Sequence, residues 1–177
     1  GATDKAIKRL LELSEERGDL ADAALLEAAL AYKHSSRPAQ ASQLMQQFTE
    51  QFPASPQYPR AAWELAWGQY LSGNLVAAET SLTRLLNDKT YRERAIYWSA
   101  RIKERTDRAA ESKQDYKQLQ QEFPFGFYAS WHRQQNNIPT NWPSLPDGLP
   151  LPPYPAGTER IQTLATLGLL SKARTEL

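Results

Sequence analysis

The sequence predicts an all-α protein built from repeated pairs of antiparallel helices, and three observations support this fold class. Apolar residues recur at the three- and four-residue spacing of a helix face along most of the chain. No stretch shows the alternation of apolar and polar residues that is typical of a half-buried strand. A pattern of small and apolar residues also repeats with an offset of 33 to 34 residues.

The first three helices are predicted from their caps and their apolar faces. A first helix is expected over residues 4–17, where Ile7 and Leu11 share a face and Gly18 ends the pattern. Asp19 is expected to cap a second helix that runs to about residue 34 and has a face of alanines. Pro38 suits the first turn of a third helix, which ends before Pro53.

Five more helices follow from the same reasoning. They are expected over residues 59–72, residues 75–87, within residues 91–108, over residues 108–122, and from about residue 125 onward. The fourth is expected to stop at Gly73 and Asn74 because glycine and asparagine accept the backbone of a helix end. Pro124 closes the seventh.

The helices form pairs, and the pairs repeat. Residues 62–82 correspond to residues 95–116, and a fainter earlier unit covers residues 28–52. An offset of this size is the period of helix–turn–helix repeats of the tetratricopeptide kind. Such pairs bury their apolar faces only by stacking, so we expect a right-handed superhelix.

Three segments are predicted along the chain. Tetratricopeptide-like repeats are expected over residues 1–138 and a proline-rich extended linker over 139–157, which holds seven of the twelve prolines. Residues 158–177 are expected to begin a further helix pair that is cut off without a cap. The chain is therefore expected to be a fragment of a longer protein.

Composition excludes several classes of function. The 177 residues carry a formal net charge of +1, which disfavours nucleic-acid binding. No apolar run approaches the 18 residues of a membrane span. The chain has no cysteine and two histidines, His34 and His132, without carboxylates spaced for a metal site. We expect no cofactor, no metal and no catalytic residue.

Aromatic residues gather in two of the predicted helices. Trp98 shares a helix face with Ala95 and Ile102, and this spacing favours packing in the core. The same interpretation applies to Trp63, Trp67 and Tyr70. The alternative is a surface for glycan or peptide made by Tyr97, Arg101 and Arg105. Residues 84–117 hold ten basic and six acidic side chains, which is a weak excess of positive charge.

Residues 91–131 also resemble a known family, the soluble lytic murein transglycosylases. The resemblance rests on Tyr97 and Trp98 followed by Ser99, Ala100 and Arg101, then Tyr116 and Leu119, and then Pro124 with Phe127, Tyr128 and Ala129. Residues 61–86 and 160–177 are similar to other helix pairs of that family. Before residue 58 the chain shows only a generic helical repeat.

This resemblance implies a non-catalytic helical scaffold from a periplasmic peptidoglycan-processing enzyme. In that family a superhelical domain precedes a catalytic domain, whose Glu-Ser and Gly-Leu-Met-Gln motifs are missing here. Glu111 and Ser112 form a Glu-Ser pair, but they are expected mid-helix among charged residues, which differs from the apolar context of the family's motif. The implied partners are peptidoglycan strands and the absent catalytic domain. The alternative is an independent adaptor that binds a protein segment.

Overall fold

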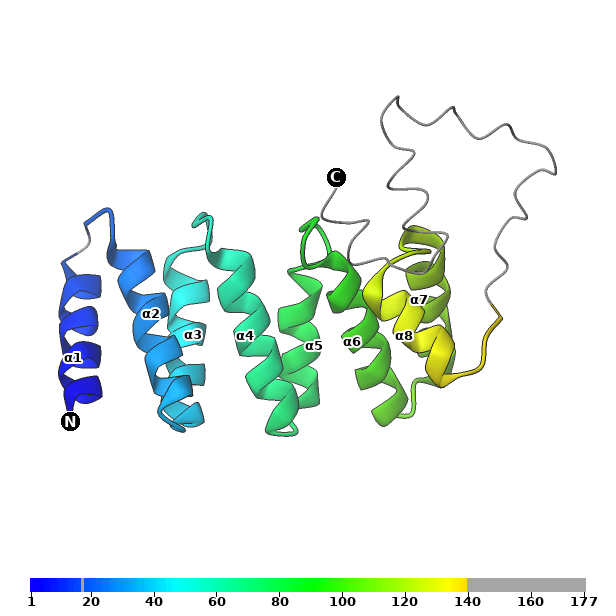
Figure 1. The fold of residues 1–177 in the computed structure, drawn as a ribbon, viewed down its shortest axis with the longest axis horizontal. Coiled ribbons are helices and arrows are strands. Elements are labelled where there is room, and N and C mark those ends of the chain that lie inside the picture. Colours follow the sequence, from blue (N-terminus) through cyan, green and yellow to red (C-terminus); the bar gives the residue numbers. More distant parts are fainter. Residues whose placement is uncertain (17, 140–177) are drawn as a thin grey trace, which may run out of the picture. The chain divides into compact units, whose positions relative to one another are not determined.

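The structure is a computed structural model that describes residues 1–16 and 18–139. The described residues contain eight helices and no strand, so the predicted all-α class is confirmed (Figure 1). The helices are α1 (Ala2–Glu15), α2 (Ala21–His34), α3 (Pro38–Gln51), α4 (Tyr58–Leu71), α5 (Leu75–Thr83), α6 (Arg92–Arg105), α7 (Ala109–Glu122) and α8 (Phe127–Gln135). Residues Gly1–Pro139 form one compact unit. Residues 140–157 of the linker predicted over 139–157, and the helix pair predicted over 158–177, lie outside the described residues.

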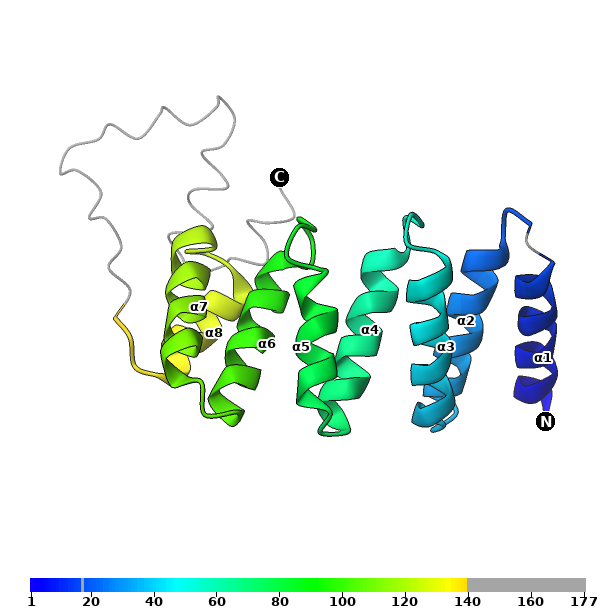
Figure 2. The same ribbon diagram turned by 180° about the vertical axis from the view of Figure 1, so that it is seen from behind.

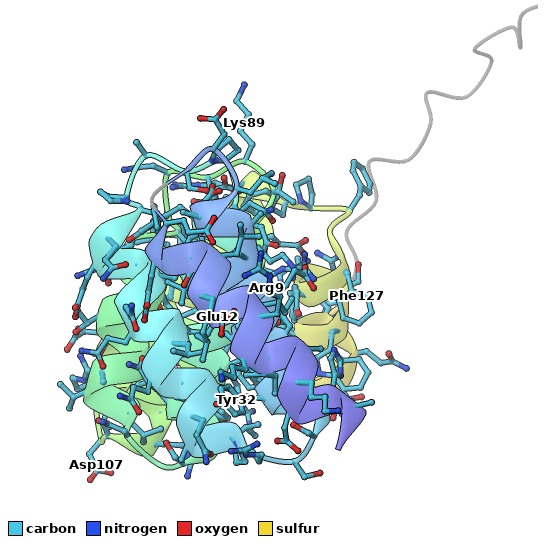
Figure 3. The ribbon with its side chains drawn as sticks, turned by 90° about the vertical axis from the view of Figure 1, so that its left-hand side faces the viewer. Arg9, Glu12, Tyr32, Lys89, Asp107 and Phe127 are labelled. Atoms are coloured by element: carbon cyan, nitrogen blue, oxygen red, sulfur yellow. The ribbon has the colours of Figure 1, made fainter. Side chains whose placement is uncertain are left out.

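The helices stack as an array in which each one packs on its neighbours in the chain. Every consecutive pair from α1 to α8 is in contact, and α6 also contacts α8. The even-numbered helices form one layer and the odd-numbered helices the other. The last pair shows this plainly, because α8 lies in front of α7 in Figure 1 and behind it in Figure 2, which is the view from the opposite side. Viewed along the array from α1, Asp107 in the α6–α7 turn and Lys89 in the α5–α6 loop mark opposite ends of the helices (Figure 3).

One turn geometry recurs after each even-numbered helix and defines the repeat. Ser36, Gly73, Asp107 and Asn137 have φ angles of 58°, 81°, 56° and 50°. In each case the next residue donates its backbone N–H to a carbonyl five residues earlier, at 2.9 to 3.0 Å. This is the Schellman closure of a helix end. Helices α2, α4, α6 and α8 are therefore equivalent, and we call them the first helices of their pairs.

The helix starts follow the sequence in most places and correct it in others. Pro38 lies in the first turn of α3 and Asn74 caps α5, where its side chain accepts the N–H of Ala77 at 3.4 Å. Asp19 does not cap α2, because the N-cap position falls on Leu20, which makes no side-chain cap. Helix α5 ends at Thr83, four residues before the predicted end, and α8 begins at Phe127 rather than near residue 125.

The core consists of three apolar clusters arranged along the array. The first is centred on Leu26 and Phe48 between α2, α3 and α4. The second is centred on Leu82 and Ile102, and the third on Leu119. Trp98 packs against both the second and the third cluster. A repeat array of this kind buries its apolar surface between neighbours instead of around one centre.

Candidate protein-binding surface

Helix α6 carries a row of large side chains along one side. Arg94, Trp98, Arg101 and Arg105 are four, three and four residues apart, which keeps them within about 60° around the helix axis. We call these four residues the α6 row. Arg101 and Arg105 are exposed, and Arg94 and Trp98 are half-buried. The row therefore offers arginines at its ends and an aromatic ring between them.

Aromatic rings continue from this row onto both neighbouring first helices. On α4, Trp63 stacks on Trp67 with centroids 6.0 Å apart, and Trp67 stacks on Tyr70 at 5.6 Å. Trp98 meets Trp67 edge-on at 4.8 Å and Tyr70 at 4.9 Å. Such offset and edge-to-face contacts stabilise aromatic pairs beyond simple burial.

The ring contacts extend to α8 through Tyr97. Its ring lies 5.4 Å from that of Trp98 and 5.0 Å from that of Tyr128, and Tyr128 leads on to Phe127 at 5.1 Å. Phe127 in turn stacks on Trp131 at 6.2 Å. Phe127 is 68% exposed and Trp131 is 45% exposed, and Figure 3 shows Phe127 at the side of α8. We call this series the aromatic ladder: Trp63, Trp67, Tyr70, Trp98, Tyr97, Tyr128, Phe127 and Trp131.

The three residues predicted as a contact surface do not have equal access to a ligand. Tyr97 is 6% exposed and forms the buried centre of the ladder. Arg101 lies 3.5 Å from Glu104, and Arg105 places its guanidinium 5.2 Å from the ring centre of Tyr70. Arg101 and Arg105 are thus the outward-facing members, and a ligand role for all three stays a prediction.

Sequence reasoning missed several members of the surface. Trp63, Trp67 and Tyr70 were predicted as core. Trp63 and Tyr70 do pack against the second cluster, but all three stay partly exposed and extend the ladder. Phe127 and Trp131 were not singled out as a surface, although their four-residue spacing repeats that of Trp63 and Trp67. Arg94 lies 5.1 Å from the ring centre of Trp63 and 4.7 Å from that of Tyr91. Its position seven and eleven residues before Arg101 and Arg105, or about two and three helical turns, was the available signal.

Three of the ten basic residues counted over residues 84–117 form ion pairs between helices. Arg92 binds Glu122 of α7 at 2.6 Å, and Lys103 binds Asp115 at 2.7 Å. Arg108 pairs with Glu79 of α5. These partly buried pairs connect neighbouring helices, whereas Arg94, Arg101 and Arg105 form no ion pair with another helix within residues 1–16 and 18–139.

Burial sets the protonation state of the aromatic hydroxyl at the centre. It raises the pKa of Tyr97, and the nearby Arg101 guanidinium opposes this rise only in part. Tyr97 therefore stays neutral at physiological pH. Burial also lowers the pKa of His132, whose ring stacks on that of Tyr116 with centroids 3.8 Å apart.

No three His, Cys, Asp or Glu side chains of residues 1–16 and 18–139 come close enough together to hold a metal ion. Glu111 lies on the exposed side of α7, 3.8 Å from Arg108.

No helix within the described ranges is both long enough and apolar enough to cross a membrane.

Comparisons with known proteins define the class of fold. The model of the tetratricopeptide repeat family matches residues 23–55 and 94–125, which coincide with the pairs α2–α3 and α6–α7. The chain therefore carries tetratricopeptide-like repeats. Among curated proteins no sequence matches this chain.

Solved structures show the same fold. The crystal structure of MamA has a TM-score of 0.57 at 16% identity, over 77% of this chain and 80% of that chain. A putative kinesin light chain of Podosopora anserina with nearly identical TPR-like repeats has a TM-score of 0.57 at 14% identity, over 98% of this chain and 86% of that chain. At these identities the likeness concerns the fold alone. Nothing in these matches indicates a lytic murein transglycosylase.

Proposed function

We propose that this chain is a protein-binding module that holds a segment of a partner protein against the first helices α4, α6 and α8. The observation that carries the proposal is the aromatic ladder with the adjacent arginines of the α6 row. Tryptophan, tyrosine and arginine are enriched among the few residues that contribute most of the binding energy at protein interfaces. Apolar residues scattered singly over a surface are common, whereas a connected series across three helices is typical of a binding site.

The rigidity of the ladder supports the same function. Each ring is held by contacts with its neighbours, as between Trp67 and Trp98 at 4.8 Å. A partner that docks on preformed rings loses little free energy to ordering of this chain. Tetratricopeptide-like arrays offer extended surfaces of this kind, and protein segments are their usual ligands.

Selection from a random peptide library displayed on phage tests the proposal. The wild-type chain is used as bait and compared with the double variant Phe127→Ala/Trp131→Ala, whose substituted side chains are exposed and contribute little to the core. We expect the wild-type chain to enrich related peptides that lose binding to the double variant. Peptides that bind both baits equally, or no enrichment at all, would contradict the proposal.

We keep a second candidate, the helical scaffold of a periplasmic lytic transglycosylase-type enzyme. It rests on the sequence pattern around Tyr97 and Trp98. The structure offers another reason for this pattern, because Tyr97, Ser99 and Ala100 are buried where α6 packs on its neighbours, and helix repeats share small and aromatic residues at such positions.

Incubation of the chain with purified murein sacculi separates the two candidates. For the protein-binding module we expect no pull-down with sacculi and no soluble anhydro-muropeptides. Sacculus binding that is lost in Arg101→Gln, but not in a matched Lys117→Gln control, would favour the murein candidate.

A further inference from the structure

We propose that the partner segment is acidic and extended, with two carboxylates three to five residues apart on either side of apolar residues. The carboxylates would bind Arg94 and Arg105, and the apolar side chains would contact the rings of Trp67 and Trp98. This inference rests on the proposed function and specifies its ligand.

The two arginines are held by aromatic faces and lack acidic partners. Arg94 lies over Trp63 and Tyr91, and Arg105 lies over Tyr70. Within residues 1–16 and 18–139, neither arginine forms an ion pair with a carboxylate. By contrast, Arg92 and Arg108 each bind a glutamate of a neighbouring helix.

Stacking leaves the hydrogen-bonding groups of an arginine available. A guanidinium that lies over a ring directs its N–H donors sideways, in its own plane. These donors form a fork that matches the two oxygens of a carboxylate. The rings also restrict the motion of the two arginine side chains, so binding of a ligand costs less of their conformational entropy.

Three glutamates of the first helices α2, α4 and α6 are already partnered. Glu64 of α4 binds Lys33 at 2.6 Å, and Glu104 lies 3.5 Å from Arg101. Glu27 faces Arg60 at 3.9 Å. The ion pairs Lys33–Glu64 and Arg60–Glu27 are therefore neutral. Arg94 and Arg105, at the two ends of the α6 row, keep a positive charge that an acidic ligand can neutralise.

The spacing of the arginines sets the spacing of the acids. Arg94 and Arg105 are eleven residues apart on α6, which corresponds to a rise of about 16 Å. Both guanidiniums lean over rings of α4, and Trp63 and Tyr70 are about 10 Å apart along that helix. An extended chain advances about 3.3 Å per residue, so distances of about 10 to 16 Å span roughly three to five residues.

Binding of fluorescein-labelled peptides, measured by anisotropy at low salt, tests this inference. The probes carry a Phe-Leu centre and two glutamates placed one, four or eight residues apart, with glutamine versions of each. We expect the four-residue spacing to bind best, about tenfold tighter than its glutamine version. Arg94→Gln and Arg105→Gln should each remove this preference, with unchanged circular dichroism, while Lys117→Gln on α7 keeps it.

The outcomes that overturn the inference differ from those that overturn the proposed function. Equal binding at all three spacings, or equal binding of the glutamine peptides, would exclude the paired-carboxylate ligand. If heparin competed as well as the best peptide, the binding would reflect non-specific attraction between opposite charges, and the inference would be rejected. Library peptides that depend on Phe127 and Trp131 but lack acids would leave the protein-binding function standing and reject only this ligand.

Discussion

At the scale of single residues, Trp98 connects the aromatic ladder to the core. The residue is half-buried and packs against two of the three apolar clusters. Its indole N–H is covered and has no partner in the described part of the chain. It therefore serves the core on one side and the surface on the other.

Replacing Trp98 with alanine should lower the free energy of unfolding by about 3 kcal/mol, because the change opens a cavity between two clusters. Trp131→Ala is the matched control, since the side chain of Trp131 is 45% exposed and should cost under about 1 kcal/mol. Urea unfolding followed by far-ultraviolet circular dichroism measures both. Equal midpoints for the two variants would show that Trp98 is only a surface residue.

Glu93 is a second residue whose role is visible only in the folded chain. Its Oε1 accepts the backbone N–H groups of Tyr128 at 2.7 Å and Ala129 at 3.2 Å, so a side chain of α6 caps the start of α8. Gly126 leaves room for this carboxylate, since a β-carbon there would collide with it. The cap fixes the angle at which α8 presents Phe127 and Trp131.

Glu93→Ala should reduce the free energy of unfolding by about 1 to 2 kcal/mol, as for loss of a helix cap. Gly126→Ala should destabilise the wild-type chain and cost less in the Glu93→Ala background, because the collision with the Glu93 carboxylate is removed and only the close contact with Phe123 Cβ at 2.9 Å remains. Chemical unfolding of the two single variants and the double variant gives this cycle. Additive effects would disprove the contact.

At the scale of elements, the turns after the first helices share one backbone conformation but not one residue type. Gly73 adopts its φ of 81° without strain, whereas Ser36 and Asp107 adopt similar angles with a β-carbon. Gly73→Ala should therefore destabilise the chain by about 1 kcal/mol, and Asp107→Gly should stabilise it by a similar or smaller amount. Thermal unfolding of both variants checks the opposite signs. A loss of stability in Asp107→Gly would mean that the Asp107 side chain stabilises the fold by more than its positive φ destabilises it.

The pair Arg92 and Glu122 links α6 to α7 and gives stability a dependence on pH. Hydrogen bonds from Arg92, and then from Gln118, hold the pKa of Glu122 below its ordinary value of 4.5. A depressed pKa in the folded state stabilises the fold above the ordinary value, and this contribution disappears as the pH falls through the lower folded value. The melting temperature of the wild-type chain should thus fall toward that of Glu122→Gln below about pH 4.5. A difference that stays constant from neutral to acidic pH would exclude this linkage.

At the scale of the whole described unit, stability should be local. Helices pack on chain neighbours, and the first cluster around Phe48 shares no buried residue with the third around Leu119. Phe48→Ala should therefore expose the amides of α2, α3 and α4 to hydrogen exchange much more than those of α6 and α7. Exchange measured by mass spectrometry checks this. Uniform loss of protection along the array would indicate a single cooperative core.

The resemblance to lytic transglycosylases shows that a sequence pattern in a repeat fold can reflect helix packing and not a shared function. The pattern lies mostly on packing residues, including Tyr97, Tyr116 and Leu119, which are buried in the third cluster. Stacked helix pairs need small and aromatic residues at such positions whatever they bind. The repeat itself was predicted correctly, while the parent enzyme found no support beyond the pattern.

The sequence by itself determined the all-α class, the pairing of helices and most of their boundaries. The helical spacing of apolar residues and the breaks at Gly73, Pro38 and Pro124 are local signals. Such signals can be interpreted without knowing which helices pack against the segment in the fold. The turns at Ser36, Asp107 and Asn137 gave weaker signals than Gly73, since a residue with a β-carbon adopts positive φ less readily than glycine, even though asparagine and aspartate tolerate it better than most.

Tertiary structure alone decided which aromatic side chains are covered and which remain on the surface. Tyr97 and Trp98 are adjacent in sequence and about 100° apart around the same helix. Spacing gives that angle but does not say on which side α4, α7 and α8 will lie. Packing of α8 against α6 buries Tyr97 and exposes Phe127 and Trp131, and the stacking of rings from α4 frees the donors of Arg94 and Arg105. A binding surface shared by three helices exists only once those helices are placed side by side.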